Sequence, residues 1–487
     1  MRPDATFPLP EIPAGLPIGS EWVEVPGTTR VVFPYDGSTV AEAPVGAVAD
    51  ARMALDEGTA VVEAVGRLSS GTRRAILQAV ERELVGNSEE FIELLIAETG
   101  KTRIDCTAEF SRSLFTWAAA AEEVGHLHGE TVPLDIQSTG EGLLGFWVRK
   151  PIGLVIGIAG FNAPLLLASH KIAPAIGAGC PVISKPAPAT PLATLWLADI
   201  VRRAAAEHGA PPAIVQVLTG DAAVGRTLVS DPRVGAVSFT GSAAVGHQIA
   251  RDAAPRKTLL ELGSNTALVV AADADIGSAA EAVVRGGFYF NGQACIAVQR
   301  VIVCEEVVDA LIAELIGRMG ELIVGDPRRP ETRIAPLINE AATARVLKWV
   351  EEAESGGAKV VHGGGVVDRS IEPTVLLDVP ESANAWCEEI FAPVVAIRSV
   401  PAIEAAFECV NRSRYGLHAS VFTRSLATAL AAADRLEVGG VVVNEVPGFR
   451  SDIMPYGGVK DSGMGREGPR FAMEELTVTR MVIIRPQ

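Results

Sequence analysis

Apolar residues recur at helical spacing through residues 46–125. The segment EEFIELLIAETG has apolar side chains three and four positions apart, and SSGTRRAILQAVEREL opens on serines that suit a helix N-cap. From residue 151, helical patterns such as PLATLWLADIVRRAAAEHG alternate with short β-branched runs: IGLVIGI, CPVISKP, IVQVLTG and VGAVSFTG. This alternation predicts βαβ units and a parallel, doubly wound sheet.

A second α/β series begins near residue 264, with the runs NTALVV, AVQRVIVCE, VVAIRSV and GGVVVNEV. Residues 129–149 belong to neither series. Their strand-like ends could pair with the tail TVTRMVIIRPQ as an outlying sheet, whose apolar edge would be exposed unless another subunit covered it. The pattern predicts an α/β protein of two or three domains, which a length of 487 residues also favours.

Residues 151–169, PIGLVIGIAGFNAPLLLAS, carry no charge over about the length of a membrane span. They include glycines, prolines and Asn162, and the alternation stops at the GFNAP turn. A buried parallel strand followed by a loop explains the run better, because a strand covered on both faces is continuously apolar. We therefore expect no membrane segment, and the proline-rich N-terminus has no apolar core of signal-peptide length.

Composition narrows the classes of partner. The formal net charge is −17 and no basic run exceeds two residues, so we expect no nucleic-acid partner. The six cysteines are scattered without C-x-x-C, which favours reduced thiols in the cytoplasm over disulfides or a zinc site. His126 and His128 form an H-x-H pair that we interpret as a surface or packing feature, so we expect no metal.

A nucleotide site is suggested by SFTGSAAVG, residues 238–246, which ends a strand on a glycine turn and begins a helix. Free N–H groups at such a helix start bind phosphate, and Gly241 and Gly246 would permit close approach. The same pattern also makes an ordinary helix cap, and it is not G-x-G-x-x-G. Lys185, in ISKPAPATP, would leave a strand at the same sheet edge, as a solvated charge or as a nucleotide contact.

Three polar residues stand in apolar contexts. Cys295 follows Gly292 and Gln293, and is either a small buried hydrophobe or a nucleophile on a turn before a strand. Glu261, in LLELGSN, is either a salt-bridged strand-end residue or a base whose pKa is raised by apolar surroundings. Asn162 is either a turn residue or an amide donor to an oxyanion. Together they suggest a covalent catalytic site.

Eight motifs in order resemble the NAD(P)-dependent aldehyde dehydrogenases, from about residue 34 to the end: GFNAPL, SKPAPATP, FTGSAAVG, LELGSN, FNGQACIAVQR, EEIFAPV, YGLHASVFT and MPYGGVKDSGMGREG. The resemblance implies an α/β fold, divided into a Rossmann-like cofactor domain (1–128 and 150–262), a catalytic domain (263–465) and a bridging sheet (129–149 and 466–487). It also implies homodimers or homotetramers. The expected reaction oxidises an aldehyde to the acid with NAD or NADP, through a thiohemiacetal and a thioester on cysteine.

The resemblance also implies residue roles. Cys295 would be the nucleophile, Glu261 would activate water, and Asn162 with the backbone N–H of Cys295 would hold the oxyanion. Glu389 would bind the nicotinamide ribose and Phe391 would lie beside the nicotinamide. The expected cofactor contacts are Lys185, Phe239, Gly241, Ser242, Gly246, Gly263, Glu389 and Phe391.

Three positions depart from the family pattern. Pro188 stands where many NAD-preferring members have a glutamate, and without that carboxylate NADP becomes acceptable. Gly263 is followed by Ser264 instead of a second glycine, and Phe161 precedes Asn162 where others have tryptophan.

The substrate is the least determined feature. Candidate pocket residues are His170, Ala294, Ile296, Phe449, Arg450 and Arg112. If Arg112 and Arg450 converge, they favour an aldehyde with a hydroxylated or anionic tail; as an alternative each is a surface or interface ion pair, which we favour for Arg112. Ala294, where relatives that oxidise phosphorylated aldehydes often carry arginine, disfavours phosphate.

Two other function classes are compatible with this fold. A CoA-acylating dehydrogenase would lack the water-activating glutamate that Glu261 supplies. A non-catalytic binding protein would tolerate the loss of Cys295, Glu261 or Asn162, and all three are present.

Overall fold

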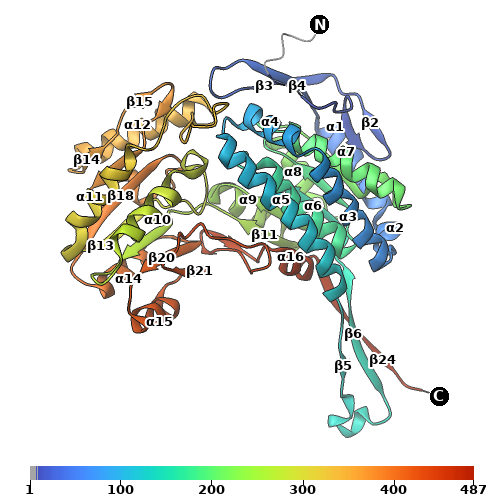
Figure 1. Ribbon diagram of the computed structural model, residues 1–487. Coiled ribbons are helices and arrows are strands. Elements are labelled where there is room, and N and C mark those ends of the chain that lie inside the picture. Colours follow the sequence, from blue (N-terminus) through green and yellow to red (C-terminus); the bar gives the residue numbers. More distant parts are fainter. Residues whose placement is uncertain (1–6, 8, 487) are drawn as a thin grey trace.

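The computed structural model describes residues 7 and 9–486 and is an α/β protein with two largely parallel sheets and a small antiparallel one (Figure 1). Two hairpins begin the chain, of β1 (Leu16–Ile18) with β2 (Glu21–Val23) and of β3 (Gly27–Val32) with β4 (Thr39–Val45). Helices then cover the region of helical periodicity, as predicted: α1 (Val48–Ala60), α2 (Val62–Gly66), α3 (Ser70–Gly86), α4 (Ser88–Thr99) and α5 (Arg103–Glu123). The hydroxyl of Ser69 caps α3 by accepting the N–H of Thr72.

The first sheet has the strand order β23-β11-β10-β7-β8-β9, with β23 antiparallel to an otherwise parallel set. Its strands are β7 (Leu154–Ile158), β8 (Val182–Lys185), β9 (Val215–Val217), β10 (Val234–Thr240), β11 (Lys257–Glu261) and β23 (Gly463–Met464). Its helices are α6 (Pro164–Ala178), α7 (Leu192–Glu207), α8 (Ala222–Ser230) and α9 (Ala243–Ala253). The four predicted strand runs and the helix between the second and third of them are confirmed.

The uncharged run 151–169 contains β7, a five-residue loop and the start of α6, so the predicted strand and loop are present and a helix begins within the same run. Pro164 begins the helix at a position where a missing N–H costs nothing. Within the described part of the chain, no helix combines the length and the apolar character that crossing a membrane requires.

The second sheet has the order β14-β17-β18-β13-β12-β20-β21, with β14 antiparallel at one edge. Its strands are β12 (Ala267–Val270), β13 (Arg300–Cys304), β14 (Lys359–His362), β17 (Thr374–Leu377), β18 (Val394–Val400), β20 (His418–Phe422) and β21 (Gly440–Val443). Its helices are α10 (Ile276–Phe288), α11 (Val308–Met319), α12 (Glu340–Ser355), α13 (Asn384–Cys387), α14 (Ile403–Asn411) and α15 (Leu426–Arg435). Val269 packs into the core on one face of this sheet and Leu268 into the core on the other, which explains the continuous apolar strands.

A third, antiparallel sheet joins β5 (Thr131–Val132), β6 (Leu144–Pro151) and β24 (Thr477–Ile484), and it projects from the body (Figure 1). Leu144 pairs with Ile484 and Pro151 with Thr477, so the predicted pairing of this segment with the tail is confirmed. The helix α16 (Pro469–Glu475) leads into β24 and packs on α6. Short pairs join β15 (Val366–Val367) to β16 (Ser370–Ile371) and β19 (Tyr415–Gly416) to β22 (Val459–Lys460). The three-domain boundaries given above stay a prediction.

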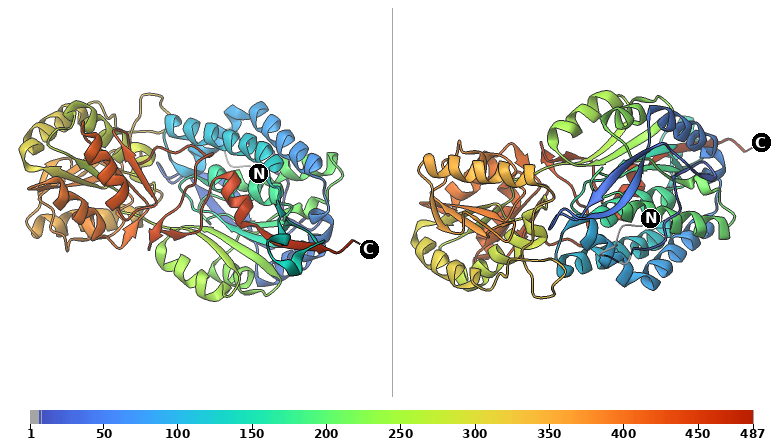
Figure 2. Two further views of the ribbon diagram at one scale, coloured as in Figure 1. Left: turned by 90° about the horizontal axis from the view of Figure 1, so that it is seen from below. Right: turned by 90° about the horizontal axis from the view of Figure 1, so that it is seen from above.

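The carboxyl ends of the strands in the first sheet lie next to the beginning of the second sheet. Lys185, Ile158 and Phe239 are in register at the carboxyl ends of β8, β7 and β10, and Glu261, at the end of β11, lies one position further on, opposite Thr240. Only residues 262–266 separate β11 from β12, so that edge lies beside the beginning of the second sheet. Figure 2 shows the two α/β units side by side from opposite directions. The chain thus brings two polar strand ends, Lys185 and Glu261, to the junction between the two α/β units.

Candidate active site

Cys295 lies in a tightly constrained loop between α10 and β13. Phe290, Asn291 and Gly292 are all left-handed, with φ of 54°, 56° and 69°. A Cβ on Gly292 would lie 2.1 Å from the carbonyl of Ala392, so only glycine fits there. Backbone strain of this kind persists only where its surroundings impose it, as at many active sites.

Side chains fix the same loop from both directions. The side-chain oxygen Oδ1 of Asn291 accepts a hydrogen bond from the backbone N–H of Ala335 at 2.9 Å. The side-chain oxygen Oε1 of Gln293 accepts one from the backbone N–H of Ile338 at 3.1 Å. The hydroxyl of Thr266 donates to the backbone oxygen of Cys295 at 3.1 Å. The cysteine is therefore held in one position before any ligand binds.

The sulfur of Cys295 has one polar neighbour of particular interest, the hydroxyl of Tyr456 at 3.3 Å. Burial raises the pKa of the Cys295 thiol to about 11, while the Tyr456 hydrogen bond and the charge of Arg450 act in the opposite direction. As a residue Cys295 is only partly buried, whereas Cys106, Cys180, Cys304 and Cys409 are buried.

Asn162 joins the two α/β units at this point. Its Nδ2 donates to the backbone oxygen of Gln293, two residues before Cys295, at 2.8 Å. An amide nitrogen carries two hydrogens, so the second N–H of Asn162 can serve another acceptor. The structure thus brings Asn162 and Cys295 together, as the site hypothesis requires.

Glu261 ends β11 as a buried side chain, and its Oε2 has no hydrogen-bond partner within the described residues. Burial, followed by the charge of Glu467, raises the pKa of Glu261 well above its usual range. A Cβ on Gly457 would lie 3.0 Å from Oε1 of Glu261, so glycine leaves room there. A buried carboxylate with a raised pKa is suited to accept a proton from water near neutral pH.

A buried network of charges surrounds the base. Lys171 pairs with Oε1 of Glu467, and Arg450 Nη2 lies 3.2 Å from Oε2. His170 lies between two carboxylates, with Nδ1 3.3 Å from Glu467 and Nε2 3.2 Å from Asp452. Although burial opposes ionisation, Lys171, His170 and Arg450 lower the pKa of Glu467 well below its usual range.

The two arginines proposed for substrate binding both meet Asp452. Arg450 is buried, and its Nε lies 3.2 Å from Asp452 Oδ1. Arg112, on α5, is 31% exposed, and its Nη2 lies 3.8 Å from the same oxygen. The other carboxylate oxygen accepts the hydroxyl of Thr116 at 2.9 Å. Despite its burial, contacts with His170, Arg450 and Arg112 lower the pKa of Asp452 far below its usual range.

The expected nucleotide contacts lie along the carboxyl edge of the first sheet. Lys185 is buried; burial lowers its pKa, and the charge of Asp221 opposes that shift. Ser242 is the N-cap of α9, but its side chain makes no capping hydrogen bond within the described structure, so the first N–H groups of α9 are left for a ligand. A Cβ on Gly241 would lie 2.5 Å from the Phe239 ring, and one on Gly246 would lie 2.3 Å from Leu262. Packing therefore explains both glycines.

Glu389 and Phe391 belong to the second α/β unit, in the loop between α13 and β18. Glu389 accepts a hydrogen bond from the N–H of Ser264 at 2.9 Å. Burial raises the pKa of Glu389 to about 7, although this hydrogen bond acts in the opposite direction. A Cβ on Gly263 would lie 2.5 Å from Oε2 of Glu389. Phe391 is left-handed, with φ of 53°, and its ring meets that of Phe161 edge-on at 5.8 Å.

Comparison with known proteins agrees with this arrangement. Residues 22–482 match the family model described as the aldehyde dehydrogenase family. The chain belongs to this family. It is 37% identical to the 3-sulfolactaldehyde dehydrogenase of Priestia megaterium over 471 residues, 96% of this chain and 98% of that protein. The sequence-based assignment is thereby confirmed, and the chain is an oxidoreductase that oxidises an aldehyde with NAD or NADP.

Solved structures of the family superpose over nearly the whole chain. Aldehyde dehydrogenase 21 from Physcomitrella patens, in complex with succinate, has a TM-score of 0.93 and 35% identity, covering 97% of this chain and 98% of that one. Glyceraldehyde-3-phosphate dehydrogenase from Methanocaldococcus jannaschii, complexed with NADP, has a TM-score of 0.91 and 34% identity, covering 95% and 100%. The predicted α/β fold class is confirmed.

The residues of this aldehyde dehydrogenase fit a dinucleotide. Uncapped N–H groups at the start of α9 suit a phosphate, and the buried ammonium of Lys185 suits a ribose hydroxyl or a phosphate. A side chain at position 263 would collide with the carboxylate of Glu389. Glycine at this position therefore leaves that carboxylate free to bind a ribose. These contacts remain predictions for the individual residues.

The remaining predicted residues differ in exposure. Ile296 is buried with Tyr456 and Leu417 beside Cys295, whereas Phe449 is 54% exposed. His170 is buried between its two carboxylates. The structure therefore places Ile296 at the nucleophile and His170 within the charge network.

Sequence reasoning missed Tyr456, Asp452, Glu467 and Lys171. Lys171 offered a signal, because it is the one side chain with a permanent charge in the mostly apolar helical run PLLLASHKIAPAIGA. Tyr456 and Glu467 lie in MPYGGVKDSGMGREG, a motif that carried the resemblance without a role.

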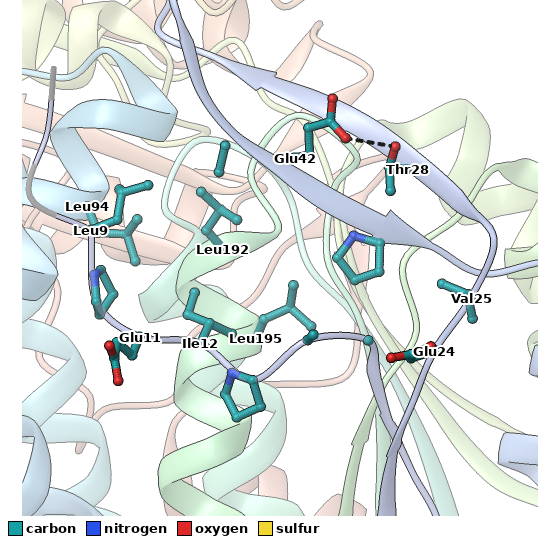
Figure 3. A pocket seen from close by; sticks show the side chains of 16 residues that line it. Leu9, Glu11, Ile12, Glu24, Val25, Thr28, Glu42, Leu94, Leu192 and Leu195 are labelled. Atoms are coloured by element: carbon teal, nitrogen blue, oxygen red, sulfur yellow. Dashed lines mark hydrogen bonds between the residues drawn. The ribbon is translucent and has the colours of Figure 1, made fainter. Parts of the chain in front are cut away.

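A separate surface pocket of about 790 Å³ lies away from Cys295, against the N-terminal hairpins and α7 (Figure 3). Its lining combines Leu94, Leu192 and Leu195 with three carboxylates, and the hydroxyl of Thr28 donates to Glu42 at 3.1 Å. The described lining of this pocket contains no cysteine, serine or histidine and none of the residues predicted from the sequence for the catalytic or cofactor site.

Within the part of the chain described above, no group of three or more His, Cys, Asp or Glu could hold a metal ion.

Proposed function

We propose that this aldehyde dehydrogenase oxidises small aldehydes whose tail carries a carboxylate, a sulfonate or a hydroxyl group. The supporting observation is the unequal pairing at Asp452, whose Oδ1 lies 3.2 Å from Arg450 but 3.8 Å from the partly exposed Arg112. A guanidinium that is loosely paired and accessible can bind anionic oxygens in pairs.

The charge balance near the site supports an anionic substrate. Three cations, Lys171, Arg112 and Arg450, face two carboxylates with lowered pKa values, Asp452 and Glu467. Burial, followed by the charge of Glu467, raises the pKa of Glu261, so this carboxyl group opposes the cations less than an ordinary carboxylate would. The surplus is positive, and a partly buried field of this sign attracts anions.

Two relatives have ligands of the same chemistry. The Priestia megaterium protein is named for 3-sulfolactaldehyde, and the Physcomitrella patens structure holds the product succinate. Both compounds carry an anionic group, which supports the same substrate class for this chain.

The mechanism follows from the residues at the junction. The Cys295 thiolate adds to the aldehyde carbon, a C–S bond forms, and the carbonyl π pair moves to oxygen. The free N–H of Asn162 and the backbone N–H of Cys295 hold this oxyanion. When bound, NAD(P)⁺ supplies the hydride acceptor.

Release of the acid depends on Glu261. Its carboxylate takes a proton from water as the water oxygen attacks the thioester carbon. The tetrahedral adduct then collapses, the C–S electron pair returns to sulfur, and the carboxylic acid leaves. Because this base is present, a CoA-acylating activity is not favoured, and neither is a non-catalytic role.

We also propose that the protein forms a homodimer or homotetramer and that it is located in the cytoplasm. The projecting sheet exposes Leu144, Met481, Ile483 and Ile484 by 42–57%, and such an apolar arm is suited to pairing in a homodimer or homotetramer. Six free cysteines, four of them buried, are compatible with the reducing cytoplasm.

The test of function is an aldehyde panel with both cofactors, with and without CoA. We expect higher kcat/KM for a carboxylate- or sulfonate-bearing aldehyde than for propanal, no dependence on CoA, and no turnover by Cys295→Ala. Near-normal turnover in C295A would contradict the mechanism, and a preference for propanal would contradict the substrate class.

A further inference from the structure

The hydroxyl of Tyr456 lies 3.3 Å from the sulfur of Cys295, across 161 residues of sequence. Tyr456 is 2% exposed, and its backbone exchanges two hydrogen bonds with Glu467, at 3.1 and 2.6 Å. The guanidinium of Arg450 lies 3.8 Å from the centre of the ring, and the ring of His418 packs edge-on at 5.1 Å. The phenol is therefore fixed in place and aimed at the nucleophile.

We infer that Tyr456 is a further catalytic residue, which donates its O–H to the Cys295 sulfur whenever that sulfur carries negative charge. This inference rests on the proposed role of Cys295 as the nucleophile. A hydrogen bond from a neutral donor to a charged acceptor is stronger than the same bond to a neutral thiol or thioester, so it favours the thiolate selectively.

The direction of donation follows from the surroundings of the phenol. Burial raises the pKa of Tyr456 well above its usual range, so the phenol keeps its proton at working pH. The cation of Arg450 over the ring opposes that shift, and a ring polarised in this way is a better donor. A thiolate has no proton to give, so the bond runs from Oη to Sγ.

The bond acts at two stages of the cycle. Before addition, the thiol S–H bond breaks and its proton passes to solvent, while the phenol O–H stabilises the sulfur pair that remains. In deacylation, the C–S bond breaks and its electron pair returns to sulfur, where the same O–H receives it. The phenol remains protonated throughout, and no oxidant or reductant is needed.

The test is the pH dependence of Cys295 alkylation by iodoacetamide in the wild type, Tyr456→Phe and Tyr415→Phe, read by mass spectrometry of the peptide that contains Cys295. In this reaction the sulfur displaces iodide, so the rate follows the thiolate fraction. Tyr415 is a matched control, because its buried ring carries a hydroxyl that bonds to Arg414 instead of Cys295. Cysteine reactivity requires no knowledge of the substrate.

In Y456F we expect the apparent pKa of Cys295 to rise by about one unit, as loss of a charge-assisted hydrogen bond predicts. At a fixed pH below that pKa, the thiolate fraction falls about tenfold while its intrinsic nucleophilicity rises, so the net rate should fall about threefold. Y415F should follow the wild-type profile. With an anionic aldehyde, Y456F should also lower kcat more than it raises KM.

Superimposable profiles for the wild type and Y456F would overturn the inference, and so would an equal shift in Y415F. Failure of the proposed function has a different signature, namely turnover in C295A. If Y456F does not fold, replacing the four tyrosines by 3-fluorotyrosine keeps every side chain in place and acidifies the phenol. The apparent pKa of Cys295 should then fall, and an unchanged value would equally overturn the inference.

Discussion

Asn162 donates through Nδ2 to the backbone oxygen of Gln293 at 2.8 Å, and this bond ties the loop after β7 to the loop of the nucleophile. One hydrogen of the amide is used in this bond, so the other is held in a defined direction. The same residue thus joins the two α/β units and supplies a preorganised donor beside Cys295.

Replacing Asn162 should slow formation of the oxyanion. In Asn162→Ala we expect the rate of the reduced-cofactor burst to fall about 10²–10³-fold, the usual loss for one oxyanion donor. Stopped-flow absorbance of NAD(P)H measures this rate. Cofactor affinity should stay near wild type, and a large loss of affinity would mean that Asn162 acts by holding the two units together.

Replacing Glu261 should separate acylation from deacylation. Glu261→Gln keeps the size of the buried side chain but cannot take a proton from water. We expect a normal burst of reduced cofactor, followed by a strongly depressed steady state, in rapid-quench experiments. If burst and steady state fall together, Glu261 serves structure or thiol activation instead.

Glu467 should set the pH range of deacylation. Burial is the largest cause that raises the pKa of Glu261, and the negative charge of Glu467 is the second. Glu467→Gln removes that charge and should therefore lower the pKa of Glu261. Glu261 acts when ionised, so activity rises with pH through its pKa, and the acidic limb of the steady-state profile should move to lower pH.

That variant also leaves Lys171 without its buried partner, which costs about 3–5 kcal/mol of stability, so the profile is measured well below the unfolding temperature. Glu445→Gln is the control, because Glu445 pairs with Arg285 at the surface. An acidic limb that moves to higher pH in E467Q would contradict the assigned coupling.

Many strands of both α/β units could be predicted, because short β-branched runs determine them locally, whereas edge strands such as β14 were not identified. Cys295 and Glu261 could be recognised in the sequence as candidate site residues, because each stands out from an otherwise apolar stretch. The contact of Tyr456 with Cys295 could not be predicted, because it joins residues 161 positions apart and depends on how the second unit docks. The position of His170 between Asp452 and Glu467 was hidden for the same reason.

Arg112 should distinguish anionic from neutral aldehydes. Arg112→Gln removes the partly exposed guanidinium but leaves Arg450 on Asp452, so the buried network is preserved. We expect KM for a carboxylate-bearing aldehyde to rise about tenfold, equivalent to about 1.4 kcal/mol, and KM for propanal to change little. Steady-state kinetics with both substrates measure the difference. Equal changes for the two aldehydes would show that Arg112 does not contact the tail.

Cofactor choice should depend on Pro188, an exposed turn residue three positions after Lys185. A glutamate here would bond the ribose hydroxyls and repel a 2′-phosphate, and proline does neither. We therefore expect the wild type to use both cofactors, with kcat/KM values within about a hundredfold, or about 2.7 kcal/mol.

Pro188→Glu should shift this ratio toward NAD, mainly by weakening NADP binding, because the added carboxylate repels the 2′-phosphate near Lys185. Pro188→Gln is the matched control: it also releases the φ restraint of proline but adds no charge, so its ratio should move much less. Steady-state kinetics with both cofactors on the three proteins measure the shift. If the wild type already excludes NADP by far more than a hundredfold, another group reads the ribose, and Pro188 does not determine the preference.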